Sequence, residues 1–167
     1  MNANMADFAH PTRYSWLTAI AGKYVNEWFT LSASALATVI NEQADKGGSA
    51  GNHRKLTPYV SATFKPFRNE EFRVRFFYKD IFRLPSFNDL YYQEVGNSKL
   101  KPENARQYNI GLTYSRNVCT FLPYLSATVD AYYNKVTDKI IAYPTKNLAV
   151  WSMRNLGSVE IKGIDAT

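Results

Sequence analysis

The chain has 167 residues, a formal net charge of +6 and an aromatic content of 15%. This length suffices for one domain with a core of its own, and the aromatic content excludes a disordered chain and favours β-structure. The Lys and Arg residues are spread along the chain without any recognition motif, which excludes nucleic acid as the expected partner.

Alternation of apolar and polar residues is the strongest pattern along the chain. Successive side chains of a strand point to opposite sides, so a period of two predicts one apolar and one polar face. Seven segments show it, the first and last only imperfectly: 13–21, 28–39, 59–65, 72–79, 107–115, 125–134 and 156–165. They predict an all-β fold, an antiparallel meander of about seven strands.

The connections between these segments alternate in length. The short ones are 22–27, 67–70 and 116–123, the last containing Cys119, and the long ones are 41–54 (with Ser49), 83–106 and 137–152. Short turns on one side and long loops on the other are typical of outer-membrane β-barrels. Crossing a membrane as a helix is excluded, because the most apolar run, Trp28 to Ile40, is too short.

The two faces of the predicted strands also suit a barrel in lipid. Small residues such as Ala33, Ala35, Ala127 and Ala131 lie on the apolar faces, where they would fill a soluble core poorly. The opposite faces carry the residues that we expect to face a polar lumen: Arg73, Arg75, Lys79, Thr128 and Asp130. Alternation alone does not exclude a soluble antiparallel barrel or sandwich that has one face of its sheet exposed to water.

Three motifs in the second half of the chain are more specific. The first motif has three parts: F-R-x-P-S-x-x-x-L-Y from Phe82 to Tyr91, G-N-x-x-L-K-P-E from Gly96 to Glu103, and Y-x-x-G-L from Tyr108. The second motif is the D-x-I pattern Asp138-Lys139-Ile140, and the third is the stretch from Asn155 to Asp165. Together they resemble the signature of TonB-dependent outer-membrane receptors, with Asn109 and Asp165 where that family usually has Glu. The motif residues are Phe82, Arg83, Pro85, Leu90, Tyr91, Gly96, Asn97, Leu100, Pro102, Glu103, Tyr108 and Gly111.

This resemblance implies a fold, a location and partners. The family forms a barrel of about 22 strands with a plugged lumen in the Gram-negative outer membrane. Residues 1–167 would then be part of the barrel, with the plug domain and the C-terminal strands absent. The implied partners are outer-membrane lipid, the TonB energy-coupling complex through the missing plug, and a small-molecule chelate.

The motif residues are expected to be architectural, forming an extracellular loop between two strands. Arg83 and Glu103 are expected to pair across its base, whereas Tyr91, Tyr92 and Phe87 are expected at the membrane interface in preference to a ligand site.

The function predicted from the sequence is transport. No catalytic triad, phosphate-binding loop or metal motif is present in the sequence, which predicts neither an enzyme nor a cofactor. We expect a segment of a TonB-dependent receptor that imports a scarce chelate, such as an iron-siderophore complex or a cobalamin. The alternative is a small self-contained β-barrel or β-sandwich that binds or adheres without transporting.

Overall fold

Seven long strands and one short helix make up the fold. The computed structural model describes residues 10–45, 51–68, 71–92, 95–116, 124–144 and 151–167. In chain order the elements are β1 (Thr12–Val25), β2 (Phe29–Gln43), β3 (His53–Phe64), β4 (Glu71–Arg83), α1 (Phe87–Tyr91), β5 (Glu103–Arg116), β6 (Leu125–Pro144) and β7 (Trp151–Ala166).

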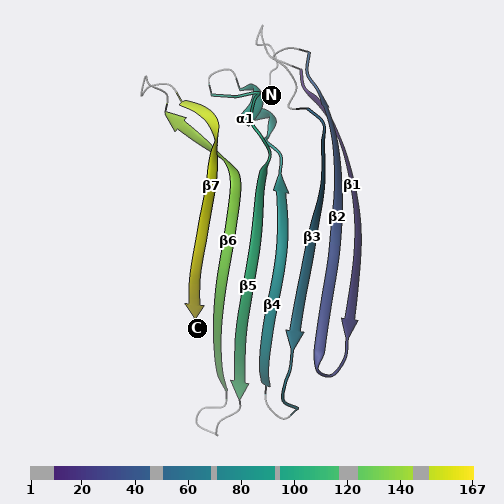
Figure 1. Cartoon of the computed structure of the whole chain (residues 1–167), viewed down its shortest axis with the longest axis vertical. Coiled ribbons are helices and arrows are strands. Elements are labelled where there is room, and N and C mark those ends of the chain that lie inside the picture. Colours follow the sequence, from purple (N-terminus) through teal and green to yellow (C-terminus); the bar gives the residue numbers. More distant parts are fainter. Residues whose placement is uncertain (1–9, 46–50, 69–70, 93–94, 117–123, 145–150) are drawn as a thin grey trace.

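The strands form one antiparallel sheet in the order β1-β2-β3-β4-β5-β6-β7. They stand side by side as a curved wall, with α1 at the end where β4 stops and β5 starts (Figure 1). We call this the α1 end. The predicted meander of about seven strands is therefore confirmed, including the weakly patterned first and last strands. The sheet is open, because β1 and β7 are its two edges.

Most strands are longer than the alternation predicted, and all three long connections are correspondingly shorter. β2 continues to Gln43 and β3 begins at His53, whereas residues 41–54 were expected to be loop. β5 starts at Glu103, and β6 runs to Pro144, well into the predicted 137–152 connection. In β2 and β3 the added residues, such as Asn41, Glu42, Arg54 and Lys55, are polar on both faces, so the alternation of apolar and polar residues is lost while the backbone pairing continues.

The predicted alternation of connection lengths holds only in part. The segment 84–102 between β4 and β5 is long, as expected. The connection 145–150 between β6 and β7, however, spans no more residues than 65–70 at the opposite end. Ser49 and Cys119, which were assigned to opposite ends of the sheet, both lie outside the described residues.

The register separates two faces of the sheet. Arg75 pairs with Gly111, which pairs with Asp130, and the next row over, Val74, Leu112 and Val129, points to the other side. We call these the polar face and the apolar face. The other residues predicted to face the lumen, namely Arg73, Lys79 and Thr128, share the polar face with Arg75 and Asp130.

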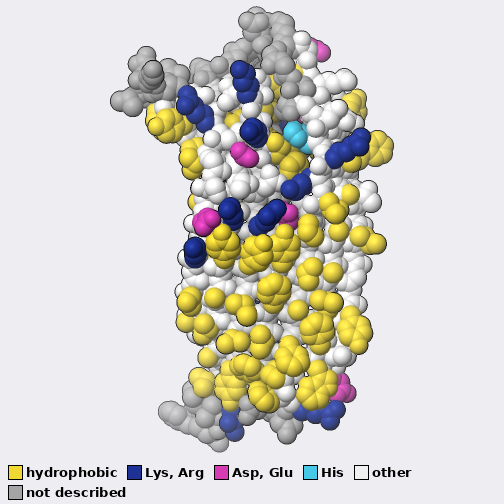
Figure 2. Space-filling view, in the orientation of Figure 1, with side chains coloured by type: hydrophobic (Ala, Val, Ile, Leu, Met, Phe, Trp, Pro, Cys, Tyr) yellow, Lys and Arg dark blue, Asp and Glu magenta, His cyan; other side chains and the backbone are white. Residues whose placement is uncertain are grey.

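The apolar face is exposed over much of the sheet. Phe76 is 43% exposed, Ile110 53% and Val129 44%. In Figure 2 hydrophobic side chains cover the lower part of the sheet, and charged side chains gather above them, toward the α1 end. A wall with this much exposed apolar surface needs an apolar surrounding.

The buried core is small and lies at the α1 end. It consists of Leu90, Tyr91, Leu100 and Ile140, with Met153 packed against it. Within the described residues, no helix is long and apolar enough to cross a membrane.

Candidate functional site

The motif residues lie in and around residues 84–102, whose described parts, 84–92 and 95–102, fold back across the polar face at the α1 end. We call this segment the clasp. It begins with Pro85, whose side chain is fully buried, and continues into α1. Ser86 caps the helix by accepting from Asp89 N at 3.1 Å, and Asp89 Oδ2 accepts from Ser86 N at 2.9 Å. This reciprocal capping box explains why a helix of only five residues forms here.

Glu42 on β2 holds the first part of the clasp. Its carboxylate accepts from Arg13 Nε at 2.6 Å and from the Tyr91 hydroxyl at 2.7 Å. Arg13 also donates to the carbonyl of Pro85 at 2.9 Å, and its guanidinium lies 4.7 Å from the centre of the Phe87 ring. The Glu42 side chain is only 1% exposed, so losing Arg13 would leave a buried charge without its counter-charge, at a cost of about 3–5 kcal/mol.

Arg83 and Glu103 close the base of the clasp, as expected from the sequence. Their side chains approach to 3.3 Å, and Arg83 also lies 3.6 Å from the Asp89 carboxylate. Glu103 in addition accepts from the backbone N–H of Ile140 on β6 at 3.2 Å. The pair therefore ties β4, β5, β6 and α1 together at one point.

Gly96 and Asn97 turn the clasp toward β7. A Cβ on Gly96 would lie 2.6 Å from both the backbone N and the backbone O of Tyr92, so only glycine fits. Asn97 donates through Nδ2 to Met153 O at 2.9 Å, and Met153 N donates to Val95 O at 2.8 Å. Backbone and side chain thus both anchor the clasp to β7.

Asn155 connects the remaining motifs. Its Oδ1 accepts from Lys101 N at 2.8 Å, while its Nδ2 lies 2.9 Å from Lys101 O and 2.7 Å from Asp138 O. Asp138 has a φ of 54°, a left-handed conformation that turns its carbonyl out of the regular ladder. The L-K-P-E, D-x-I and N-x-G fragments, far apart in the sequence, therefore meet at one amide side chain.

Two motif glycines on the polar face make room for larger neighbours. Arg75 reaches across β5 to Asp130, at 3.0 Å, over Gly111, where a Cβ would clash with the Asp130 carboxylate. Tyr132 on β6 lies over Gly163 of β7 in the same way. Tyr108, the other residue of the Y-x-x-G-L motif, lies on the apolar face between the rings of Tyr78 and Tyr133.

The other motif residues and aromatic side chains divide between packing and exposure. Leu90 and Leu100 are in the buried core, the Phe82 ring lies 6.4 Å from that of His53, and Pro102 O accepts from Asn104 at 3.4 Å. The expectation that Tyr91 lies at a membrane interface is wrong, because this side chain is buried against Glu42. Phe87 and Tyr92 are exposed.

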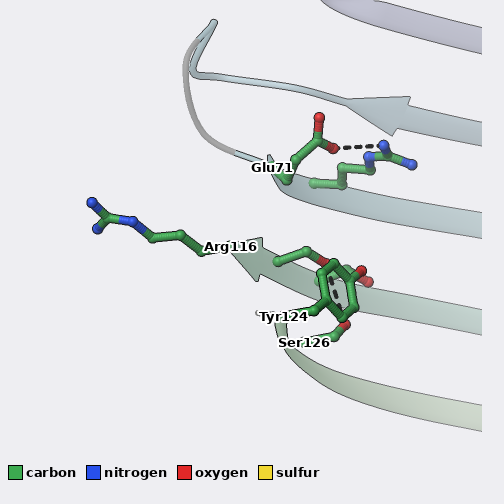
Figure 3. A pocket seen from close by; sticks show the side chains of 7 residues that line it. Glu71, Arg116, Tyr124 and Ser126 are labelled. Atoms are coloured by element: carbon green, nitrogen blue, oxygen red, sulfur yellow. Dashed lines mark hydrogen bonds and ion pairs between the residues drawn. The ribbon is translucent and has the colours of Figure 1, made fainter. Parts of the chain in front are cut away.

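A polar pocket lies at the opposite end of the sheet, between β4, β5 and the start of β6. Its volume is about 430 Å³, and it is lined by Glu71, Arg73, Thr113, Ser115, Arg116, Tyr124 and Ser126. In Figure 3 Tyr124 lies beside Ser126, whereas Arg116 points away from the other labelled side chains. Hydrogen bonds with the hydroxyls of Ser115 and Ser126 lower the pKa of the exposed Tyr124. Among the described residues, no three His, Cys, Asp or Glu side chains come together as metal ligands.

Sequence reasoning missed several residues that hold the clasp. Arg13 and Glu42 carry no local signal, because their partners lie 29 to 72 positions away in the chain. Asn155 belongs to a motif that we recognised, but its contacts with Lys101 and Asp138 depend on the three-dimensional arrangement.

Comparison with known proteins identifies relatives of the chain. The family described as "TonB dependent receptor-like, beta-barrel" matches residues 13–167. The chain is 33% identical over 84 residues to the vitamin B12 transporter BtuB of Vibrio vulnificus, covering 50% of this chain and 13% of that protein. It is 32% identical over 90 residues to BtuB of Photobacterium profundum, covering 52% of this chain and 14% of the relative.

A solved structure supports the fold. The FrpB iron transporter from Neisseria meningitidis (F3-3 variant) superimposes with a TM-score of 0.67 at 16% sequence identity. The match covers 96% of this chain and 24% of the FrpB chain. The chain therefore spans between an eighth and a quarter of the length of these relatives.

The close approach at Gly96 gives a test of the clasp. We expect Gly96→Ala to destabilise the detergent-solubilised full-length protein by about 1–3 kcal/mol, because the new methyl group must displace backbone atoms of Tyr92. Gly157→Ala is the matched control, since a Cβ there meets nothing within 4 Å. The measurement is the midpoint of thermal unfolding followed by circular dichroism, and equal midpoints for the two variants would contradict the tight packing described here.

Proposed function

Because this chain belongs to the TonB-dependent receptor β-barrel family, we propose that it forms part of the barrel wall of a receptor that imports a scarce nutrient chelate. The family is not enzymatic, and its members lie in the outer membrane of Gram-negative bacteria. In this proposal, energy for uptake comes from the inner membrane through the TonB complex.

The apolar-face residues of β5 carry this proposal. After Asn104, the one nearest the α1 end, they are Arg106, Tyr108, Ile110, Leu112, Tyr114 and Arg116. Charged residues at both ends, tyrosines next to them and aliphatic residues in the middle match the profile of a membrane, with interfacial aromatics bordering the hydrocarbon. The interval from Arg106 to Arg116 also agrees with the roughly 9–11 residues that a tilted strand needs to cross.

The polar face would then line the lumen. Arg75 and Asp130, like Arg73 and Glu71, form ion pairs that remain partly exposed, which suits a hydrated interior. Because the chain covers only part of its relatives' length, we propose that other parts of the receptor supply the plug, the closing strands and the contact with TonB. Neighbouring strands would pair with β1 and β7, whose free edges are not tolerated in lipid. A self-contained barrel or sandwich is disfavoured for the same reason.

The cargo that we propose is a cobalamin or an iron chelate. The curated relatives are named as vitamin B12 transporters, and the structural neighbour is named as an iron transporter. Both cargo classes are scarce metal complexes. The sequence identity of 32–33% with the two BtuB proteins favours testing cobalamin first.

The facing of β6 can be tested with a pair of substitutions in the full-length receptor. Val129→Arg would place a charge on the apolar face and cost about 2–4 kcal/mol if that face meets the bilayer core. Thr128→Arg, one residue away, would point to the polar face and be milder. The measurement is the yield of heat-resistant barrel in outer-membrane fractions, and an equal or reversed effect would refute the assignment of the faces.

The orientation of the barrel can be tested by thiol labelling in a Cys119→Ser background. Lys99 is exposed within the clasp, and the Arg68 side chain is 71% exposed near the opposite end. On intact cells, a membrane-impermeant maleimide should label Lys99→Cys but not Arg68→Cys, which should react only after permeabilisation. The reverse pattern would place the clasp in the periplasm.

Uptake assays test the transport function itself. Cells producing the full-length receptor should accumulate labelled cobalamin or an iron-siderophore complex, and unlabelled competitor should suppress the signal. A strain lacking TonB is the control, in which accumulation should fall to background because binding without energy coupling does not deliver the cargo. Accumulation that is unchanged without TonB would contradict energy-coupled import.

A further inference from the structure

The polar pocket at the end of the sheet opposite the α1 end has the size and the donors of a small-molecule site. Its volume of about 430 Å³ falls within the roughly 300–1,000 Å³ of such sites. Three hydroxyl groups gather on one side of it, because Ser115 Oγ lies 3.2 Å from Ser126 Oγ and the Tyr124 hydroxyl bonds to both. Each of these groups is able to donate a hydrogen bond to an oxygen atom of a bound molecule.

The charges beside these hydroxyl groups do not cancel. Among the described residues that line the pocket, Glu71 is the one carboxylate. It lies 2.7 Å from Arg73 and 3.9 Å from Lys65, so two cations share one negative charge. The Arg73 side chain is 44% exposed, and its guanidinium has more N–H donors than the contact with Glu71 uses. The pocket therefore combines an excess of positive charge with several hydrogen-bond donors, which favours an anionic oxygen.

Two residues further along β4, toward the α1 end, the balance of charge on the polar face is reversed. Arg75 pairs with Asp130 at 3.0 Å, but Asp130 is also the register partner of Asp165 on β7. Two carboxylates therefore accompany one cation at this level. An anionic group next to the polar face is repelled here relative to the pocket, so the attraction is local to the pocket.

From this arrangement we propose that the pocket is an exit site of the transport path, which binds an oxyanion group of the cargo before the cargo enters the periplasm. The proposal rests on the proposed function, in which cargo enters at the α1 end and leaves at the opposite end. Both proposed cargo classes carry such groups, either the phosphodiester of a cobalamin or an anionic oxygen of an iron chelate. Arg73 would bind this group by charge-assisted hydrogen bonds, and the neighbouring hydroxyl groups would donate to its other oxygens. Cargo held there would move on instead of returning to the outer side.

The test compares cargo binding with cargo uptake in cells that produce the full-length receptor. The probes are labelled cyanocobalamin and labelled cobinamide, which is the same corrin without its phosphate-bearing side chain. We expect Arg73→Gln to lower the maximal rate of TonB-dependent cyanocobalamin uptake about tenfold, the effect of losing one charge-assisted hydrogen bond. The rate of cobinamide uptake should not change. The dissociation constant of cyanocobalamin on cells lacking TonB should also stay the same, because Arg73 is remote from the outer side. For a receptor that takes up only iron chelates, a chelate with a free carboxylate and its methyl ester replace the two probes.

Three further variants separate an anion site from a structural ion pair. Glu71→Gln removes the carboxylate that competes for Arg73, so cyanocobalamin uptake should be as fast as in the unchanged receptor or faster. A purely structural pair predicts equal losses for Glu71→Gln and Arg73→Gln. Arg73→Lys keeps the charge and should recover most of the rate. Arg116→Gln is the matched control and should have no effect, since Figure 3 shows the Arg116 side chain pointing away from the other labelled side chains.

The proposal is overturned by equal losses for Arg73→Gln and Glu71→Gln, by an equal loss for both probes, or by a loss with Arg116→Gln. Uptake that no longer depends on TonB in Arg73→Gln would also overturn it, because the pocket would then hold another part of the receptor instead of cargo. If Arg73→Gln lowers the yield of heat-resistant barrel, the double variant Ser115→Ala, Ser126→Ala replaces it with the same expectation. Failure of the proposed function is distinct, since the unchanged receptor would then show no TonB-dependent uptake of any of these probes.

Discussion

Every strand of this sheet must pair its backbone with a neighbour, and the rest of the structure depends on that requirement. In hydrocarbon an unpaired N–H or C=O group costs several kcal/mol, so a membrane wall made of strands has to be a continuous ladder. Here each strand pairs with the next along the chain from β1 to β7, and the β3–β4 ladder is the shortest, running from Tyr59–Lys79 to Phe64–Val74. Once the ladder is fixed, the side chains of each strand alternate between lipid and lumen, which explains why a sequence with few continuous apolar runs suits a membrane.

The clasp solves a different problem at the α1 end, where the strands rise above the apolar belt. Isolated, the segment 84–102 has too few apolar residues for a core of its own. It is held instead by side chains from strands near the two opposite edges of the sheet. Glu42 on β2 binds Tyr91, and Asn155 on β7 binds Lys101. The clasp therefore links strands that are far apart in the order of the sheet. Because it is bound to both β2 and β7, the clasp restrains the separation of these two strands.

The strand order and facing could be predicted from the sequence, because the alternation of apolar and polar residues is a local property of each strand. Segments such as 107–115 alternate without interruption, and their facing in the sheet follows the pattern. The strand ends could not be predicted. Asn41 and Glu42, for example, pair with β1 through their backbone, but both are polar although they point to opposite faces of the sheet. Nor could the clasp contacts be predicted. Arg13 is an unremarkable cation in a weakly patterned segment until β1 brings it beside Glu42. The short α1 was also missed, because its capping box lies within a segment that is otherwise rich in turn residues.

The chemistry of the clasp also bears on how receptors with one motif can serve different cargoes. The polar groups of Arg13, Glu42 and Asn155 and the Tyr91 hydroxyl are engaged within the chain, in contacts of 2.6–2.9 Å. A side chain so engaged cannot bind a ligand without first giving up a buried hydrogen bond, which costs about 1–3 kcal/mol. In the receptor proposed above, these contacts would constrain the shape of the wall and leave cargo selection to other groups. The Phe87 ring is exposed but lies against Arg13 and near the Tyr91 ring, so a substitution there would also disturb the clasp. The exposed Tyr92 side chain is not one of these engaged groups, and a substitution there can alter binding without removing these hydrogen bonds.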